Sequence, residues 1–431
     1  MSTLYNPHSF NLLNFAEHPA QQLLAERDGS RRMNPHLNQL QPYPFQKLRQ
    51  LMEGILPAAT LEPIHLQIGE PKHATPDFIR QAVINHLDGL SMYPTTLGAP
   101  ALRNCIAAWL KRRFNGPEIN PETEVIPVNG SREALFSFAQ AIIDSSVRDP
   151  VVVCPNPFYQ IYEGAALLAG ATPYFINTFP DNQFKLDYTQ LPEAVWSRVQ
   201  LVYVCSPNNP TGSVMTLADW QELFALSDRH GFIVASDECY SEIYLDENNP
   251  PLGALDAAHQ LGRAGFPRLV VFNSLSKRSN APGLRSGFVA GDARLLEKFL
   301  LYRTYHGSAM SPVVQAASVA AWNEESHVVE NRRLYTQKFS EAIDVLSSVA
   351  AVQMPDASFY LWIKTPISDT EFTRRLYRDY NVTVLPGSFL ARNAQGMNPG
   401  ENFIRVALVA SPQECAEAMQ RMKLFFEKLG I

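Results

Sequence analysis

A lysine, two serines and an arginine form the first group of residues whose types and spacing could do chemistry. The string NSLSK at 273–277 places Lys277 just after two hydroxyl residues, Ser274 and Ser276, and Arg285 follows in the string PGLR. A lysine amine forms a Schiff base with an aldehyde when its surroundings keep it reactive. The two hydroxyls and the guanidinium fork suit a phosphate group. A solvated lysine is the alternative, because an S-x-S-K string is common by chance.

A carboxylate at the end of an apolar run forms the second group. Asp237 follows the string VAS, and a carboxylate that ends a buried strand is costly unless it has a cationic partner. A protonated pyridine nitrogen would be such a partner, and the ion pair would keep the ring electron-withdrawing. Tyr240 lies three residues later, close enough to offer its phenol to the same ring. A helix N-cap aspartate is the alternative interpretation.

The string SPNNPTG at 206–212 is the most specific signal in the chain. Two prolines within four residues fix a rigid turn, and the bond between Asn209 and Pro210 is a candidate cis peptide. A rigidly held asparagine amide suits a hydrogen bond to a ring hydroxyl. An ordinary strand-to-helix loop is the alternative.

Two weaker strings complete the set. NGSREA contains Gly130, Ser131 and Arg132 at the start of a predicted helix, where backbone N–H groups make a site for a phosphate. PNPFY ends at Tyr159, which follows a predicted strand and could stack on a flat ring. Core packing is the alternative for the tyrosine.

Elements of alternating type must position these residues. Short β-rich runs alternate with helical patterns from about residue 124 to 290. The pair Thr216 and Asp219 predicts a helix start, and Gly231 can end that helix. Such alternation predicts crossover connections, a mostly parallel sheet and the α/β class, with ligands beyond the carboxyl ends of the strands. The predicted strands are 124–128, 151–154, 172–176, 200–205, 231–236, 268–273 and 286–290.

The bulk composition excludes several classes of protein. Hydrophobic residues make up 46% of the chain and charged residues 18%, a balance typical of soluble globular proteins. The net charge of −6 and the lack of a Lys/Arg run longer than three residues argue against a nucleic-acid partner. The apolar stretches are far shorter than the ~20 residues of a membrane span. Five scattered cysteines argue against a metal site or a disulfide framework, and predict free thiols in a reducing, cytoplasmic compartment.

The length of 431 residues is enough for two domains. Residues 1–32 are polar and weakly patterned, and we expect either a flexible extension or a true start at Met33. The remainder is predicted to comprise an N-terminal segment that packs with the small domain (33–70), a large domain (71–310) and a small C-terminal domain (311–431).

With all five strings in this order, the sequence resembles the class I and II aminotransferases of fold type I, which use pyridoxal 5′-phosphate (PLP). The resemblance runs from about residue 33 to the C-terminus. It implies a large α/β domain with a mostly parallel seven-stranded sheet, a smaller α+β domain, and a reaction between an amino acid and a 2-oxo acid. It gives catalytic roles to Lys277, which holds PLP and moves protons, to Asp237 at the ring nitrogen, and to Tyr240. The remaining cofactor contacts that it implies are Asn209 and Tyr240 at the ring hydroxyl, Tyr159 against the ring, and Gly130, Ser131, Arg132, Ser274, Ser276 and Arg285 at the phosphate.

The resemblance assigns three more positions. Tyr93 in YPTTLG is similar to the tyrosine that reaches the phosphate of the neighbouring subunit, which implies a homodimer with shared active sites. Arg405 in FIRV resembles the arginine that binds the substrate α-carboxylate, and Gly69 in LQIGEP the glycine beside that carboxylate, with Asn209 as a further substrate contact. A core aromatic, a surface ion pair and a turn glycine are the alternatives.

At finer grain, the strings LQPYPFQKL, IGEPKHATP, YPTTLG and PNPFYQIY are similar to those of proteobacterial succinyldiaminopimelate aminotransferases. This resemblance implies that N-succinyl-LL-2,6-diaminopimelate and 2-oxoglutarate give N-succinyl-2-amino-6-oxopimelate and glutamate, a step of lysine biosynthesis. Lys72 and His73 are hypothesised to face the distal end of that substrate; solvated loop residues are the alternative.

Other functions remain open on the same cofactor machinery. They are an aminotransferase of the aspartate, aromatic or acetylornithine type, and a PLP-dependent β-lyase. A PLP-binding regulatory protein would carry a DNA-binding domain ahead of this one, and the 32 preceding residues are too few for it. A nicotinamide dehydrogenase would carry a G-x-G-x-x-G turn, which the sequence lacks.

Overall fold

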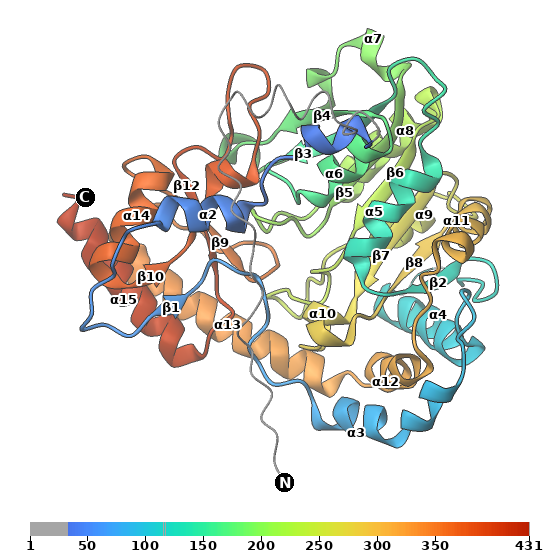
Figure 1. Cartoon of the computed structure of the whole chain (residues 1–431), viewed down its shortest axis with the longest axis horizontal. Coiled ribbons are helices and arrows are strands. Elements are labelled where there is room, and N and C mark those ends of the chain that lie inside the picture. Colours follow the sequence, from blue (N-terminus) through green and yellow to red (C-terminus); the bar gives the residue numbers. More distant parts are fainter. Residues whose placement is uncertain (1–32, 115, 117, 431) are drawn as a thin grey trace. The chain divides into compact units, whose positions relative to one another are not determined.

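The computed structural model describes residues 33–114, 116 and 118–430. It divides into two compact units, Met1–Leu40 and Gln41–Ile431. Within the first, Pro35–Gln39 forms the 3₁₀ helix η2, which Asn34 caps. The predicted extension 1–32 lies outside the described residues. All remaining elements belong to the second unit (Figure 1).

A seven-stranded sheet forms the centre of the second unit, as predicted (Figure 1). Its strand order is β2-β8-β7-β6-β5-β3-β4; β8 runs antiparallel to both of its neighbours, and the other pairs are parallel. The register places Asp237 between Cys205 on one side and Phe272 on the other. Strands β5 and β6 therefore end level with each other, and β7 beside them continues two residues further, to Ser274. The strands are β2 (Val125–Val128), β3 (Val151–Asn156), β4 (Thr172–Asn177), β5 (Val199–Cys205), β6 (Ile233–Asp237), β7 (Leu269–Ser274) and β8 (Gly287–Gly291).

Helices cover both faces of this sheet. Along β3, Val151 and Val153 pack into one hydrophobic cluster, whereas Val152 and Cys154 pack into another. Because successive side chains of a strand point to opposite faces, the two clusters are the two sides of the sheet. The helices of the first cluster are α4 (Pro100–Phe114), α8 (Leu217–His230), α9 (Ala254–Gln260) and α12 (Pro312–Asn323). Those of the second are α5 (Ser131–Ile142), α6 (Ile161–Leu168) and α11 (Ala293–His306).

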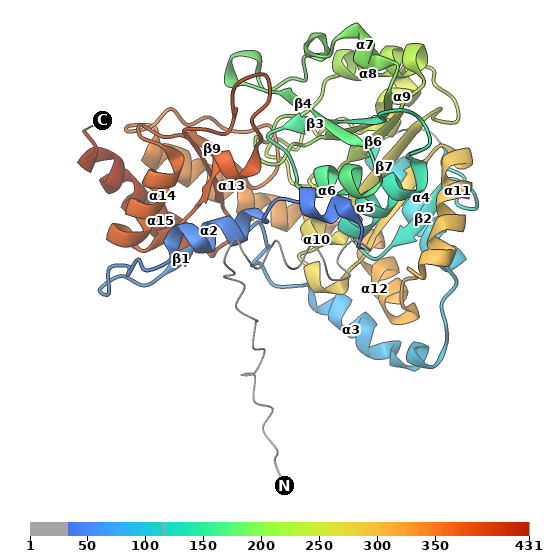
Figure 2. The same ribbon diagram turned by 45° about the horizontal axis from the view of Figure 1, so that its top comes forward.

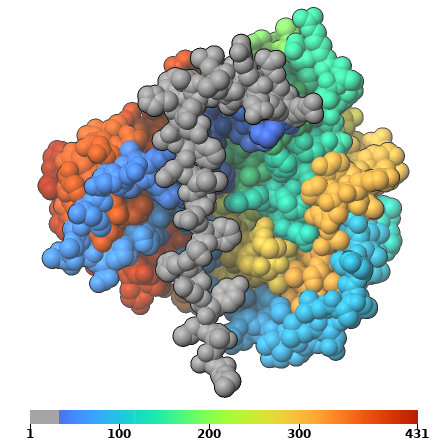
Figure 3. All heavy atoms as spheres, in the orientation of Figure 1, coloured from blue at the N-terminus to red at the C-terminus, as the bar shows by residue number. Residues whose placement is uncertain are grey.

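A smaller α+β assembly follows towards the C-terminus (Figure 2). Strands β9 (Tyr360–Lys364), β11 (Leu385–Pro386) and β12 (Phe403–Ala407) form an antiparallel sheet in the order β11-β12-β9. Strand β1 (Ile64–His65) pairs with β10 (Val382–Thr383), so the N-terminal segment packs with these C-terminal elements; its blue surface lies against their orange and red surface in Figure 3. The helices here are α2 (Pro44–Met52), α13 (Ser326–Leu346), α14 (Asp369–Tyr380) and α15 (Pro412–Lys428).

The remaining elements are short and lie between those above. They are α3 (Asp77–Asn85), η3 (Leu87–Ser91), η4 (Pro180–Asn182), η5 (Tyr188–Gln190), α7 (Glu193–Trp196), α10 (Leu275–Arg278), η6 (Pro282–Leu284) and η7 (Gly387–Leu390).

All seven predicted strands are observed, and their ends differ from the predicted ones by at most two residues. Strand β6 begins at Ile233 and not at residue 231, because Gly231 adopts a left-handed conformation (φ 81°) that closes α8. The predicted start of α8 is confirmed, since Thr216 and Asp219 form a reciprocal capping box. The domain boundaries near residues 70 and 310 stay a prediction.

All five cysteines are buried and free, as predicted. Among the described residues, no helix combines the length and the apolar character that a membrane crossing needs. Within the same residues, no group of three or more His, Cys, Asp or Glu side chains could hold a metal ion.

Candidate active site

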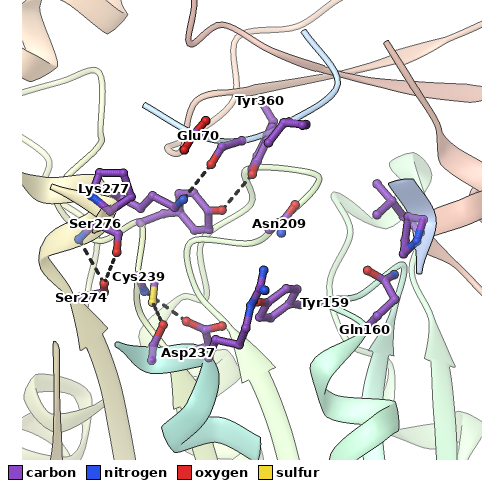
Figure 4. Close-up of a pocket in the computed structure, with 18 of the residues that line it drawn as sticks. Glu70, Tyr159, Gln160, Asn209, Asp237, Cys239, Ser274, Ser276, Lys277 and Tyr360 are labelled. Atoms are coloured by element: carbon purple, nitrogen blue, oxygen red, sulfur yellow. Dashed lines mark hydrogen bonds between the residues drawn. The ribbon is translucent and has the colours of Figure 1, made fainter. Parts of the chain in front are cut away.

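A pocket of about 570 Å³ lies where the carboxyl ends of β5, β6 and β7 meet the C-terminal assembly (Figure 4). It brings together every predicted site residue except Gly130, which lies just behind the lining, and Tyr93. The lining residues are Tyr43, Pro44, Phe45, Ile68, Gly69, Glu70, Ser131, Arg132, Tyr159, Gln160, Asn209, Asp237, Cys239, Tyr240, Ser274, Ser276, Lys277, Pro282, Arg285, Tyr360, Leu390 and Arg405.

Lys277 extends into this pocket from the short helix α10 (Figure 4). Ser274 caps α10 by accepting a hydrogen bond from the backbone N–H of Ser276, which fixes the direction of the lysine stem. The Lys277 ammonium donates to the carbonyl oxygen of Gly69 over 2.7 Å. Burial, and to a smaller extent the nearby guanidinium of Arg405, lower the pKa of Lys277 to about 8. A solvated lysine is thereby excluded, and a large fraction of this amine is neutral near pH 8.

Asp237 ends β6 at the bottom of the pocket, and its side chain is 4% exposed. Its carboxylate accepts a hydrogen bond from the Tyr162 hydroxyl at 2.7 Å and one from the backbone N–H of Cys239 at 3.3 Å. Burial raises the pKa of this carboxyl nonetheless, so a cation beside it would be stabilised. No helix begins at Asp237, which rules out the N-cap alternative.

A ring of hydroxyl, guanidinium and backbone donors surrounds the side of the pocket next to Lys277. Ser274 donates to the hydroxyl of Ser276 at 3.0 Å, and Arg285 reaches the same hydroxyl at 3.5 Å. Gly130 opens α5 with a φ of 86°, and a Cβ atom there would collide with the Arg285 guanidinium. The positive φ therefore favours glycine, and a larger residue would also displace the Arg285 guanidinium. The N-terminus of the 12-residue helix α5 adds free N–H groups at Ser131.

Arg405 extends from β12 on the opposite side, with 4% of its surface exposed. Its Nη1 donates to the Asn209 side-chain oxygen at 2.9 Å and its Nη2 to the Gln67 carbonyl at 2.8 Å, while its buried Nε has no hydrogen-bond partner. It forms no ion pair with any carboxylate of the described residues. A buried guanidinium without an anion fits a carboxylate ligand, and the surface ion pair of the alternative interpretation is not observed. The bond between Asn209 and Pro210 is cis, as predicted.

Tyr360 is a pocket residue that sequence reasoning did not identify. Its hydroxyl lies 2.9 Å from that of Tyr240, and the Arg405 guanidinium lies 4.3 Å from the centre of its ring. A Cβ atom on Gly69 would collide with the Tyr360 hydroxyl, so the glycine lets the chain pass at that point. Tyr162, the donor to Asp237, was also missed. Both tyrosines lie within apolar strings, where an aromatic residue predicts core packing.

Arg132 lies at the rim of the pocket between two tyrosines. Its Nε donates to the Tyr159 hydroxyl at 2.7 Å, and its guanidinium carbon lies 5.9 Å from the ring centres of both Tyr159 and Tyr43. Like Arg405, it lowers the pKa of Lys277, although less than burial does. Its charge therefore acts inside the pocket.

Besides Gly130, Tyr93 and the two residues hypothesised at the distal end of the substrate lie outside the pocket lining. The side chain of Tyr93 is fully exposed, so it contributes nothing to the pocket of its own chain. Lys72 is exposed and pairs with Glu70 at 3.0 Å. The His73 ring contacts Asn331 and Lys338 and faces away from the pocket. The hypothesis that Lys72 and His73 line the distal end is therefore wrong in this structure, because the chain turns after Glu70.

The donor set fits PLP in each of its parts. A phosphate matches the hydroxyls, the Arg285 fork and the α5 N-terminus, and a ring nitrogen matches the buried Asp237 carboxylate. An aldehyde matches the amine of Lys277, whose pKa is depressed to about 8. Tyr159 offers a ring face, and Asn209 and Tyr240 offer polar groups to a ring hydroxyl.

Comparisons with known proteins agree with this geometry. The model of the family described as aminotransferase class I and II matches residues 62–422. The crystal structure of an aminotransferase from Neisseria meningitidis is 53% identical, covers 91% of this chain and 100% of its own, and superposes with a TM-score of 0.89. Aminotransferase AspB from Helicobacter pylori is 37% identical, with 90% and 99% coverage and a TM-score of 0.83. Among curated relatives, the LL-diaminopimelate aminotransferase of Nitratidesulfovibrio vulgaris strain Hildenborough is 33% identical over 89% of this chain and 96% of its own length.

Proposed function

Because this chain belongs to the class I and II aminotransferases, which are PLP-dependent, we propose that its amino donor is N-succinyl-LL-2,6-diaminopimelate and its acceptor 2-oxoglutarate. The products are then N-succinyl-2-amino-6-oxopimelate and glutamate. This reaction would be a step of lysine biosynthesis.

The residues of the site divide the reaction between them. When bound, PLP supplies an aldehyde that reacts with amines and a ring that withdraws electrons from the substrate α-carbon. The Asp237 carboxylate would favour a protonated ring nitrogen, and the Tyr162 hydroxyl fixes the orientation of that carboxylate. The amine of Lys277 would accept the proton of the substrate α-carbon at Nζ and donate it again. Arg405 holds the α-carboxylate by its fork, so that the Cα–H bond points to Lys277.

The observation that supports this amino donor is a second guanidinium at the pocket, that of Arg132. Arg405 is sufficient for the α-carboxylate of any amino acid. Arg132 has no carboxylate partner among the described residues, and two tyrosines hold it at the rim. A donor with further carboxylates beyond the reacting end suits this arrangement, and N-succinyl-diaminopimelate has two of them and no distal ammonium.

LL-diaminopimelate is the second candidate donor, and a different residue favours it. Curated relatives about one-third identical to this chain are named for that substrate. Its distal end carries an ammonium as well as a carboxylate, and Glu70 at the pocket could bind that ammonium. Glu70, however, already pairs with Lys72 at 3.0 Å, which favours the succinylated donor.

Spectroscopy of the PLP-loaded enzyme tests the proposal directly. Each amine is added alone, and the loss of the visible absorption of the cofactor is followed together with the keto product. The proposal is supported if the second-order rate constant of the half-reaction is at least about tenfold higher for N-succinyl-LL-diaminopimelate than for LL-diaminopimelate, aspartate or tyrosine. If any of these other amines reacts equally fast or faster, the substrate assignment is wrong, whereas the assignment as an aminotransferase still holds.

Arg132→Met separates the rim cation from the rest of the site. It keeps the backbone N–H of the α5 N-terminus and removes the charge together with the hydrogen bond to Tyr159. We expect the half-reaction with N-succinyl-LL-diaminopimelate to slow about tenfold to a hundredfold, since a charged hydrogen bond is lost. The half-reaction with L-norleucine, which has no distal carboxylate, should be unchanged. Arg294→Met, at an exposed arginine of α11, is the control. Equal slowing with both amines would show that Arg132 does not bind a distal carboxylate.

A further inference from the structure

A partly buried hydrogen-bond chain outside the pocket connects Lys277 to the segment that carries Gly69. Asn331 of α13 donates from its Nδ2 to the backbone carbonyl of Lys277 at 3.3 Å. Its Oδ1 lies 2.7 Å from Nδ1 of His73 and accepts from Asn280 at 3.1 Å. The other ring nitrogen of His73 lies 2.7 Å from Nζ of Lys338, which is also on α13 and 1% exposed.

The carbonyl at one end of this chain determines every donor and acceptor along it. A carbonyl only accepts, so the Asn331 amide nitrogen must face Lys277 and its oxygen must face His73. His73 therefore carries its proton on Nδ1, and the bare Nε2 accepts from the Lys338 ammonium. The arrangement is complete only while the imidazole is neutral.

The charges around His73 and Lys338 favour that neutral ring. Burial, and then the Lys338 ammonium, lower the pKa of His73, whereas Glu330 on α13 raises it. Lys338 has no carboxylate within ion-pair distance among the described residues; its other contacts are the Leu408 carbonyl at 3.1 Å and the Tyr335 ring. Burial lowers the pKa of Lys338 to about 8, and Cys415 and Glu414 on α15 act in the opposite direction. On the segment of His73 itself, Lys72 and Glu70 form their own pair.

The segment that His73 anchors also touches the reacting amine. Gly69 and His73 are four residues apart, and Gly69 accepts the hydrogen bond of the Lys277 ammonium at 2.7 Å. Two hydrogen bonds therefore link Lys277 to this segment and its anchor. Its amine donates to Gly69, and its backbone carbonyl accepts from Asn331, the residue that contacts His73. The Tyr335 ring, 4.7 Å from the His73 ring centre to centre, closes the remaining side.

We propose that His73 is a positioning residue of the reaction, which as a neutral ring between Lys338 and Asn331 fixes residues 69–73 against α13 and so aligns Gly69 with Lys277. Protonation of His73 places two cations 2.7 Å apart and removes the only acceptor that the ring offers to Lys338. The segment then leaves α13, and the reaction slows on the acid side. This role does not depend on which amine is the substrate.

Two variants of His73 test the proposal. His73→Ala should lower kcat by about tenfold to a hundredfold, because a displacement of the order of 1 Å near the reacting atoms has that effect. His73→Gln, which accepts and donates without titrating, should restore most of kcat and remove the acid-side fall that the wild type shows. His86→Ala is the matched control, because His86 is exposed and contacts only the carbonyl of Ala82.

A measurement without substrate or cofactor accompanies the kinetics. Amide hydrogen exchange of the apoenzyme should speed up in residues 66–76 of His73→Ala and stay unchanged in peptides of β5 and β6. Lys338→Met removes the second cation, so protonation of His73 no longer places two charges side by side, and the acid-side fall should disappear. Unchanged exchange at 66–76, or an acid-side fall of kcat that is the same in wild type, His73→Gln and Lys338→Met, overturns the proposal.

Discussion

At the scale of single residues, the chemistry of the site depends on a lysine that the fold keeps partly uncharged. Among the described residues, Lys277 pairs with no carboxylate, and its amine donates to the Gly69 carbonyl. Burial and the charges of Arg405 and Arg132 disfavour the ammonium form, whereas the hydrogen bond to the carbonyl favours it. A lysine in water would be almost fully protonated at neutral pH and a poor nucleophile.

Lys277→Ala should retain PLP and lose turnover. The phosphate donors and Asp237 are untouched, so cofactor should still co-purify, whereas the amine that moves the α-proton is gone. We expect the half-reaction with glutamate to fall by more than about ten-thousandfold. Cofactor content and stopped-flow absorption measure the two effects separately, with Lys298→Ala, at an exposed lysine paired with Glu297, as control. Normal turnover in Lys277→Ala would end the assignment.

Recombination of the apoenzyme with PLP should depend on pH through the same amine. The pKa of Lys277 in the fold is about 8, below its unfolded value, so the neutral amine accumulates as the pH rises through 8. The rate constant should increase about tenfold per pH unit below that point and level off above it. Arg132→Met removes one neighbouring cation and should move the midpoint upward. A midpoint near the ordinary lysine value of about 10.4 in the wild type would contradict the depressed pKa.

At the scale of elements, the site is built from the ends of regular structure. Ser274 caps α10, Gly130 opens α5 and Asp237 ends β6. In each case, the backbone geometry of the helix or strand end determines the position of the functional group.

Gly130→Ala should weaken PLP binding more than it weakens the fold. The residue sits at φ 86°, and its new Cβ would displace the Arg285 guanidinium. Gly231→Ala is a matched control, because Gly231 has φ 81° at the end of α8 and open space around the added Cβ. Both variants should lose about 1–2 kcal/mol of stability from backbone strain, but only Gly130→Ala should raise the Kd for PLP, by about tenfold or more. Equal Kd values in the two variants would show that Arg285 tolerates the displacement.

Much of this element-level picture could be predicted from the sequence, because local signals encode it. Strands buried on both faces appear as continuous apolar runs, and the residues that follow them carry the chemistry, as Asp237 and Asn209 do. Tyr360, Tyr162 and the partners of His73 could not be predicted, since their contacts join positions more than 70 residues apart. The turn after Glu70 that carries His73 away from the pocket has no local signal either.

At the scale of the whole molecule, the exposed position of Tyr93 predicts that one chain does not complete the site. Its side chain is fully exposed although aromatic, and exposed apolar residues of the same stretch, Leu90 and Met92, accompany it. We expect a homodimer in which Tyr93 reaches the phosphate of the neighbouring subunit.

Complementation between two damaged chains tests that expectation. Lys277→Ala lacks the reacting amine, and Tyr93→Ala lacks the donated tyrosine. If Tyr93 acts across the interface, a mixed dimer regains one intact site, and random mixing should restore about a quarter of wild-type activity. Tyr93→Ala alone should bind PLP more weakly. Activity of the mixture equal to the average of the two parents would show that Tyr93 serves its own chain or none.

The neighbouring carboxyl ends of β5, β6 and β7 have a consequence for how this molecule can change. Register pairs Cys205 with Asp237 and Asp237 with Phe272, so these three strands lie side by side, about 4.8 Å apart, whatever their side chains are. Asn209, Asp237 and Lys277 lie at or just beyond the ends of these strands. The rim cation Arg132 comes instead from a helix on one face. Different parts of the chain thus carry the reacting groups and the rim cation that we propose to select the amino donor. We therefore expect that exchange of rim residues can change the amino donor while the reacting groups stay in place.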